Sequence, residues 1–185
     1  MRTELSKYNN GWYQPGPTLK RVLWFLIQVV FFRNILLPFS GIKVFILRLF
    51  GAKIGRGVVI KPGVRVKYPW FLEIGNYCWL GENVWIDNLA KVQLGDNVCL
   101  SQGALLLCGN HDYSSSSFDL RVEPILLEDG VWIGAQAIVC GGVSAFSHSV
   151  VTAGSVATKY LEAYGVYKGN PATKVNERKI FIKNA

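Results

Sequence analysis

The sequence predicts an all-β protein, a parallel β-helix of about five coils with an N-terminal helical cap and a short C-terminal tail. Two observations support this prediction. A 20-residue repeat begins at residue 54, and within it an aliphatic residue recurs at every sixth position. The predicted domains are an apolar, basic helical segment over 1–53, the repeat over 54–160 with a loop insertion at 107–126, and a tail over 161–185.

The six-residue step runs through fifteen positions, of which thirteen are Ile, Leu or Val and two are Ala. An α-helix cannot keep this period, because six residues rotate it well past one and a half turns. In a meander of β-hairpins, apolar and polar residues would alternate at every second position, and no six-residue period would persist from strand to strand. Three short strands joined by sharp corners do fit, because every sixth side chain then points to a shared axis. The expected inward residues are Ile54, Ile60, Val66, Ile74, Leu80, Ile86, Leu94, Leu100, Leu106, Leu127, Ile133, Val139, Ala145, Val151 and Ala157.

The N-terminal segment carries two apolar runs, over 22–32 and 42–50, each shorter than the roughly 20 residues that span a bilayer. We expect one or two helices over 18–50, broken near Pro38 and Gly41. Two roles stay open for their apolar face. It caps the first coil, as solenoids require, or it docks on the inner face of a membrane. In the second case lipid headgroups would meet Lys20, Arg21, Arg33, Lys43 and Arg48.

The net charge of +8 is concentrated in the two flanks. Residues 1–53 carry eight basic residues and one acidic residue, a net charge of +7. Residues 54–173 carry eight basic and ten acidic residues, a net charge of −2. Residues 174–185 carry four basic residues and one acidic residue, a net charge of +3. A nucleic-acid-binding protein would place its basic stripe on the folded body. Basic flanks favour a membrane surface or an anionic cofactor instead. The four cysteines form no CxxC pair, so we expect a reduced, cytoplasmic protein, with peripheral contact at the inner membrane as the alternative.

The insertions that interrupt the repeat all fall at one corner. The steps over 66–74 and 86–94 are eight residues long, and the step over 106–127 is 21. Insertion at a single corner is typical of functional loops. The longest insertion contains His111, and one coil below the same corner carries Asp87 and Asn88, so we expect these three residues to be neighbours.

Histidine is the usual general base near neutral pH, so His111 is our candidate catalytic residue. The second histidine, His148, lies inside the regular repeat, where a structural role is expected. The serines at 114–117 show no adjacent base and are expected to form a loop tip.

The segments VWIGAQAIVCGGVSAFSHSVVTAGSVATK and GNPATKV resemble the hexapeptide-repeat O-acetyltransferases. The stretch RVLWFLIQVVFFRN…LRLFGAKIG is similar to the branch of that family that serves colanic acid and other exopolysaccharide biosynthesis. The resemblance implies a left-handed parallel β-helix, which is an exception to the right-handed crossover rule. It also implies an acetyl-CoA-dependent transferase and a homotrimer with active sites between subunits.

The resemblance implies that His111, in GNHD, is the general base. Residues that match the family's acetyl-CoA contacts are Ala135, Ala153, Thr158, Lys159, Lys174 and Arg178. Two positions depart from the family pattern. Gly81 stands where galactoside acetyltransferases carry an acceptor-binding Asn, and Phe146 stands where glycine is usual.

The expected chemistry is acetyl transfer from acetyl-CoA to a sugar hydroxyl, with His111 as base and the Ala135 N–H as oxyanion donor. Asp87 and Asn88 bind the acceptor, or Asp87 orients the imidazole, or both cap a corner. Trp132 lines the pantetheine channel or packs at a strand edge.

Rival functions are N-acetylation of an amino-sugar nucleotide, an acyl-enzyme through Cys108, and a non-catalytic scaffold. A zinc site with three histidine ligands does not fit a chain with two histidines, so we expect no metal.

Overall fold

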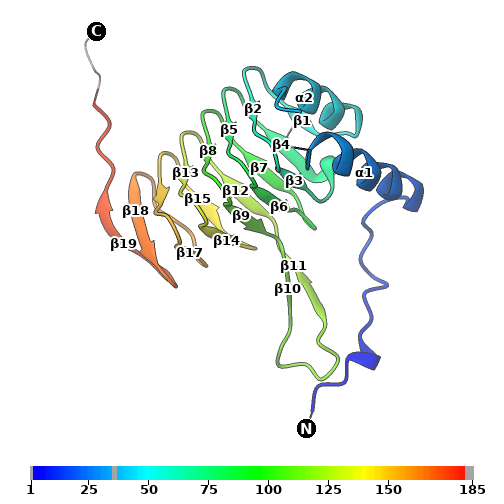
Figure 1. Ribbon diagram of the computed structural model, residues 1–185. Coiled ribbons are helices and arrows are strands. Elements are labelled where there is room, and N and C mark those ends of the chain that lie inside the picture. Colours follow the sequence, from blue (N-terminus) through cyan, green and yellow to red (C-terminus); the bar gives the residue numbers. More distant parts are fainter. Residues whose placement is uncertain (1, 35–36, 182–185) are drawn as a thin grey trace.

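The computed structural model describes residues 2–34 and 37–181, which form a solenoid with two helices at its first-coil end (Figure 1). Helix α1 spans Thr18–Phe31 and α2 spans Ser40–Leu49, preceded by a short 3-10 helix, η1 (Leu5–Lys7). One or two helices were expected over 18–50, and the structure has two, although Gly41 lies inside α2 and not at the break. Trp24 of α1 is buried against the first coil and donates a hydrogen bond from Nε1 to the Val66 oxygen at 2.8 Å.

The solenoid consists of three sheets, which we call A, B and C; each coil supplies one strand to each sheet, and the strands of successive coils are parallel. Sheet A contains β1 (Lys53–Ile54), β4 (Leu72–Ile74), β7 (Val92–Leu94), β12 (Ile125–Leu127) and β15 (Ser144–Ala145). Sheet B contains β2 (Val59–Ile60), β5 (Trp79–Leu80), β8 (Cys99–Leu100), β13 (Trp132–Ile133), β16 (Val150–Val151), β18 (Gly165–Gly169) and β19 (Ala172–Glu177). Sheet C contains β3 (Arg65–Val66), β6 (Trp85–Asp87), β9 (Leu105–Leu107), β14 (Ile138–Cys140) and β17 (Val156–Ala157), and a 3-10 helix, η2 (Pro69–Phe71), precedes β4.

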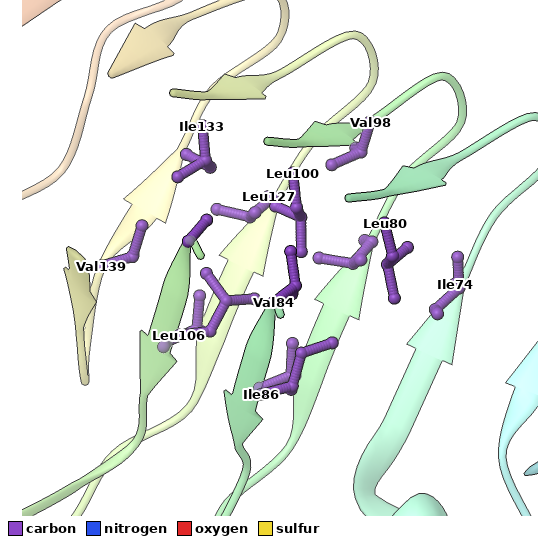
Figure 2. Packing of buried hydrophobic residues seen from close by; sticks show 14 of the residues in the cluster. Ile74, Leu80, Val84, Ile86, Val98, Leu100, Leu106, Leu127, Ile133 and Val139 are labelled. Atoms are coloured by element: carbon purple, nitrogen blue, oxygen red, sulfur yellow. The ribbon is translucent and has the colours of Figure 1, made fainter. Parts of the chain in front are cut away.

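The core is the stack of inward side chains that the six-residue period predicts (Figure 2). Of the fifteen predicted positions, all are buried except Ile54, which is half-buried beneath the cap. The register places like residues over one another: Leu80 of β5 pairs with Leu100 of β8, which pairs with Ile133 of β13. Each buried aliphatic side chain contributes about 1.5–3 kcal/mol, so this stack is the main source of stability.

The corners keep the coils close together. At Gly134, an added Cβ would lie 2.6 Å from the Ala153 backbone nitrogen of the next coil, so no larger residue fits without a shift. At the corner between sheets A and B, side-chain carbonyl and carboxylate oxygens take up the outward N–H groups. Asn76 Oδ1 accepts from Arg56 N, Asp96 Oδ1 accepts from Asn76 N, and Asp129 Oδ1 accepts from Asp96 N, at 2.7–3.0 Å.

The C-terminal region is more ordered than the predicted tail. Strand β18 continues sheet B beside β16, and β19 folds back antiparallel to β18. The resulting hairpin covers the last coil, so unpaired strand edges of sheet B are partly protected there. Residues 182–185 of the predicted tail lie outside the described residues.

The long insertion forms an antiparallel hairpin, β10 (Gly109–His111) with β11 (Leu120–Val122), which projects from the corner between sheets C and A. Residues before α1 run beside this hairpin to its tip (Figure 1), where Glu4 N donates to the Ser116 oxygen at 2.8 Å. The N-terminal stretch and the inserted hairpin therefore face one another, and the candidate site lies between them.

Candidate active site

His111 is the last residue of β10, and its imidazole is held by one residue of the same hairpin. Nδ1 lies 2.9 Å from the Phe118 carbonyl oxygen, and the His111 and Phe118 rings stack with centroids 4.4 Å apart. A carbonyl only accepts hydrogen bonds, so Nδ1 carries the proton in the neutral ring. Nε2 then holds the lone pair and has no hydrogen-bond partner among the described residues. This is the arrangement that a general base requires.

The cleft beside His111 has a volume of about 470 Å³ and also receives Asp87, as the sequence predicts. Asp87 is 8% exposed, and Lys67 Nζ lies 3.3 Å from its Oδ1. This contact is an ion pair without hydrogen-bond geometry, so the buried Oδ1 makes no hydrogen bond among the described residues. An acceptor hydroxyl would satisfy it. The contact that orients the imidazole comes from Phe118 and not from Asp87.

Asn88 has the corner-capping role instead of an acceptor-binding role. Its side chain is fully buried, its Oδ1 accepts from Tyr68 N at 3.0 Å and its Nδ2 donates to Tyr68 O at 2.7 Å. Both polar ends of the carboxamide are used within the solenoid, because this corner carries two extra residues whose backbone groups need partners.

The N-terminal stretch supplies a wall of the cleft that the repeat pattern does not predict. Tyr8 lies 5.6 Å from the His111 ring, measured between ring centroids, and Tyr13 donates from its hydroxyl to the Leu89 oxygen at 2.6 Å. Burial, and then the nearby Tyr68 and Asp87, raise the pKa of the Tyr13 hydroxyl, so it stays protonated. The two tyrosines precede the first recognisable repeat, so only their aromatic character could have signalled a role.

The rival nucleophiles are unsuitable. Cys108 is buried, and burial raises the pKa of its thiol to about 11, so the thiolate is scarce near neutral pH. At the hairpin tip, Ser115 and Ser117 donate their hydroxyl hydrogens to Asp119 and thereby stabilise the turn.

The predicted acetyl-CoA contacts lie at other corners of the same chain. Ala135 and Ala153 occupy adjacent coils at the corner between sheets B and C, whereas the His111 hairpin leaves the corner between C and A. Neither alanine N–H has a hydrogen-bond partner among the described residues, so both can bind a ligand. Trp132 precedes this corner on sheet B, is 45% exposed, and donates from Nε1 to Ser101 Oγ at 2.9 Å.

The remaining predicted cofactor residues are exposed or engaged near the last coil. Thr158 and Lys159 are exposed directly after β17. Lys174 Nζ contacts Glu162 at 2.8 Å and Glu177 at 3.2 Å, and these hydrogen bonds raise the pKa of Lys174. Arg178 donates to the Gly130 oxygen at 2.8 Å and the His148 oxygen at 3.3 Å.

His148 has a structural position, as expected. It adopts a left-handed backbone with φ of 61°, and its ring lies 5.0 Å from that of Tyr164. The neighbouring Phe146 does not disrupt the corner, since its N–H donates to the Leu161 oxygen at 2.9 Å. Among the described residues, no group of three or more His, Cys, Asp or Glu could hold a metal ion, and no helix is long and apolar enough to cross a membrane.

Comparisons with known proteins place the chain in an enzyme family. No protein-family model matches the chain. The chain is 36% identical over 166 residues to the Escherichia coli (strain K12) protein named "Putative colanic acid biosynthesis acetyltransferase WcaF". The matched region covers 90% of this chain and 91% of the relative.

Two solved structures share the fold. The hexapeptide-repeat acetyltransferase VCA0836 from Vibrio cholerae, complexed with acetyl-CoA, matches 88% of each chain with a TM-score of 0.79 at 20% identity. A maltose O-acetyltransferase from Clostridium difficile 630 matches 88% of each chain with a TM-score of 0.75 at 23% identity. These likenesses confirm the predicted left-handed parallel β-helix. With 36% identity across nine-tenths of both chains, this acyltransferase belongs to the hexapeptide-repeat acetyltransferases, in the branch of the colanic acid biosynthesis acetyltransferase WcaF.

Proposed function

We propose that this acetyltransferase moves the acetyl group of acetyl-CoA to a sugar hydroxyl in glycan biosynthesis, by direct transfer with His111 as general base. The observation that carries the proposal is the bond from His111 Nδ1 to the Phe118 oxygen, which makes Nε2 the acceptor nitrogen of the neutral imidazole, in a ring that lines the cleft. The names of two similar proteins agree with this proposal, since one is a putative colanic acid biosynthesis acetyltransferase and the other a maltose O-acetyltransferase.

In the proposed reaction, His111 Nε2 removes the proton of the acceptor hydroxyl as its oxygen attacks the thioester carbonyl. The new C–O bond forms, the C–S bond breaks, and the imidazolium returns the proton to the departing CoA sulfur. Asp87 Oδ1, buried and without a hydrogen bond, accepts from a second acceptor hydroxyl and fixes the orientation of the sugar.

A complete site in this proposal needs a second copy of the chain. His111 and the unpaired N–H of Ala135 belong to different corners of one solenoid. In a homotrimer the hairpin corner of one subunit would face the B–C corner of its neighbour. The Ala135 N–H then stabilises the oxyanion, while Ala153, Trp132, Thr158 and Lys159 line the acetyl-CoA groove and Lys174 and Arg178 lie toward its phosphates.

The test is turnover of acetyl-CoA with a panel of sugars and amino sugars, followed by mass spectrometry of the product. We expect an acetyl ester, which mild base hydrolyses, and no product from the amine of an amino sugar. A base-stable acetamide would indicate N-acetylation and would contradict the proposal, as would the absence of acetyl transfer to any sugar.

A further inference from the structure

A second cavity, of about 360 Å³, adjoins the His111 cleft and carries a high density of cationic groups. It lies between α1 and the first coils, and it shares Arg21, Lys67 and Tyr68 with the cleft. Arg33 and Arg65 complete its basic lining, and none of its lining residues is acidic. The two cavities therefore form a continuous surface that is basic at one end and holds the candidate base at the other.

The arginines of this cavity have no carboxylate partner among the described residues. Arg21 donates only to Thr18 Oγ1, and its Nε is buried without a hydrogen-bond partner. Arg65 lies over the Trp85 ring at 4.4 Å, which fixes the guanidinium without neutralising it. Partly desolvated cations without counter-charges are costly, and an anionic ligand would offset that cost.

The surrounding backbone adds to the positive potential. Helix α1 begins at Thr18 with no side-chain cap and no acid in its first turn. Its N-terminal N–H groups lie one turn from Arg21, and helix N-termini favour anions. Planar guanidinium groups match phosphate oxygens two at a time, so arginines in this number suit a phosphate or diphosphate.

We propose that the cavity lined by Arg21, Arg33, Arg65 and Lys67 binds the phosphate or diphosphate group of the acceptor, while its sugar lies against Asp87 and His111. The inference rests on the proposed function and specifies its substrate class: a glycosyl phosphate or diphosphate, not a free sugar. Such a group could come from a sugar nucleotide or from a lipid-linked sugar, and both present the same charges to the arginines.

The test measures binding of inorganic diphosphate to the full chain by calorimetry at low ionic strength. We expect binding that weakens at least tenfold in Arg21→Gln and in Arg65→Gln, and less in Arg65→Lys, which keeps the charge. The matched control is Arg56→Gln, because Arg56 also lies over an aromatic ring, Tyr77 at 5.6 Å, but lines neither cavity. Thermal melts verify that each variant is folded.

Absence of diphosphate binding, or equal weakening in Arg56→Gln, would overturn the phosphate site. Uridine diphosphate and geranyl diphosphate then distinguish the two sources. If uridine diphosphate binds more tightly than inorganic diphosphate, the acceptor is nucleotide-linked. If geranyl diphosphate binds more tightly than inorganic diphosphate, the acceptor is lipid-linked. Each outcome supports the site. His111→Ala should leave diphosphate binding unchanged, so failure of the phosphate site and failure of the proposed catalysis are distinguishable.

A separate observation concerns the outer faces of the two helices, which are apolar although they point to solvent. On α1 the exposed side chains follow helical spacing, and α2 repeats the pattern with Ile42, Phe45 and Leu49. The α1 set is Leu19, Val22, Leu23, Phe25, Leu26, Val29 and Val30. Contiguous apolar faces of this kind mark an interaction surface.

Charge identifies the partner. From residue 5 to residue 72 the chain contains no acid and eleven basic residues, counted from Lys7 to Lys67. Not all of these cations are at the surface. Lys43, expected at the lipid headgroups, is 1% exposed and donates to the Ile60 and Lys61 oxygens, because it lies on the inner face of α2. Lys7, Lys53 and Lys67 form ion pairs with Glu4, Glu73 and Asp87. The helical segment itself keeps Lys20 and Arg21 on α1, Arg33 directly after it and Arg48 on α2, and it contains no acid. This positive charge on the helices complements an anionic bilayer surface, whereas a second copy would present the same positive charge.

We infer that α1 and α2 lie in the interface of an anionic bilayer. The test is co-sedimentation of the full chain with vesicles of phosphatidylcholine containing phosphatidylglycerol. We expect binding that weakens as salt rises and is lost in Leu26→Glu and Phe45→Glu. Val175→Glu, an exposed apolar position on β19 at the other end of the solenoid, is the control. Absence of vesicle binding at low salt would overturn membrane docking. A lower oligomer mass in the helix variants would also overturn it, because it would show that a second copy of the chain covers the apolar faces.

Discussion

The carbonyl oxygen of Phe118 lies 2.9 Å from Nδ1 of His111, and the two rings stack with planes only 8° apart. Phe118, seven residues after His111, thus contacts the imidazole twice: its carbonyl oxygen at the ring edge and its own ring at the ring face. Phe118 itself adopts a left-handed backbone with φ of 54°, which turns its carbonyl and its ring to the same neighbour. Ring orientation and tautomer are both set within the inserted hairpin.

Replacement of the Phe118 ring should therefore lower catalysis without removing the base. In Phe118→Ala we expect kcat to fall about 2- to 12-fold, because a stacked ring pair contributes about 0.5–1.5 kcal/mol. The KM for acetyl-CoA should stay constant, and Phe118→Tyr should restore kcat. Steady-state kinetics with the preferred sugar measures both quantities. An unchanged kcat, or a shift in KM alone, would show that the ring does not position His111.

The capping role of Asn88 predicts a loss of stability. Asn88→Ala leaves the N–H and the oxygen of Tyr68 without their partners in a buried corner. Each of the two unsatisfied groups costs about 1–3 kcal/mol, so we expect the free energy of unfolding to fall by about 2–6 kcal/mol. Urea titration measures this change. Glu82 lies at an exposed corner, and its side chain makes no hydrogen bond to any other residue that the structure describes, so Glu82→Ala should change stability little. A similarly small effect in Asn88→Ala would contradict the capping role.

The buried thiols predict how stability depends on pH. Burial raises the pKa of Cys78 and of Cys108 to about 11, above the ordinary value of 9.0. The unfolded chain then releases these protons first, so the stability that the neutral thiols provide is complete below pH 9 and is lost as pH rises toward 11. At pH 10.5 we expect each thiol to account for about 2 kcal/mol of lost stability.

Unfolding of reduced protein at pH 8 and pH 10.5 checks this expectation. The wild type should lose more stability between the two values than Cys108→Ala does. Equal losses would refute it. The same variant should keep acetyl transfer near the wild-type rate, because an acyl-enzyme through Cys108 is not part of the proposed reaction.

The last coil offers a test of the cofactor groove. Lys174 is held toward Glu162 and Glu177 by exposed ion pairs, which contribute little to stability. If it faces the CoA phosphates, Lys174→Gln should raise the KM for acetyl-CoA several-fold while the KM for the acceptor stays the same. Truncation after Pro171 should also destabilise the protein, because it removes β19 from sheet B. A KM for acetyl-CoA that does not change in Lys174→Gln would remove this residue from the groove.

Much of the fold follows from the sequence because the repeat constrains it strongly. The six-residue phase identifies the inward residues from Ile60 to Ala157, since each must fill the same small space within a three-sided coil. The insertion over 107–126 identifies His111, and the aligned corner one coil below identifies Asp87. These predictions rest on register, which stacking preserves from coil to coil.

The remainder depends on contacts that carry no period. Nothing in the sequence brings Tyr8 and Tyr13 to the hairpin, because a stretch that precedes the repeat has no register to place it. Asp87 and Asn88 are adjacent in sequence, yet one lines the cleft and the other is used within the corner. The direction of each side chain at an irregular corner depends on the local backbone, which spacing alone does not specify.

The central claim, that His111 is the general base, is tested most directly by the rate of CoA release from acetyl-CoA in His111→Ala with a saturating sugar acceptor. The account predicts a fall in kcat of about 10²–10⁴-fold with an unchanged melting temperature. A folded His111→Ala protein that turns over at nearly the wild-type rate would contradict it.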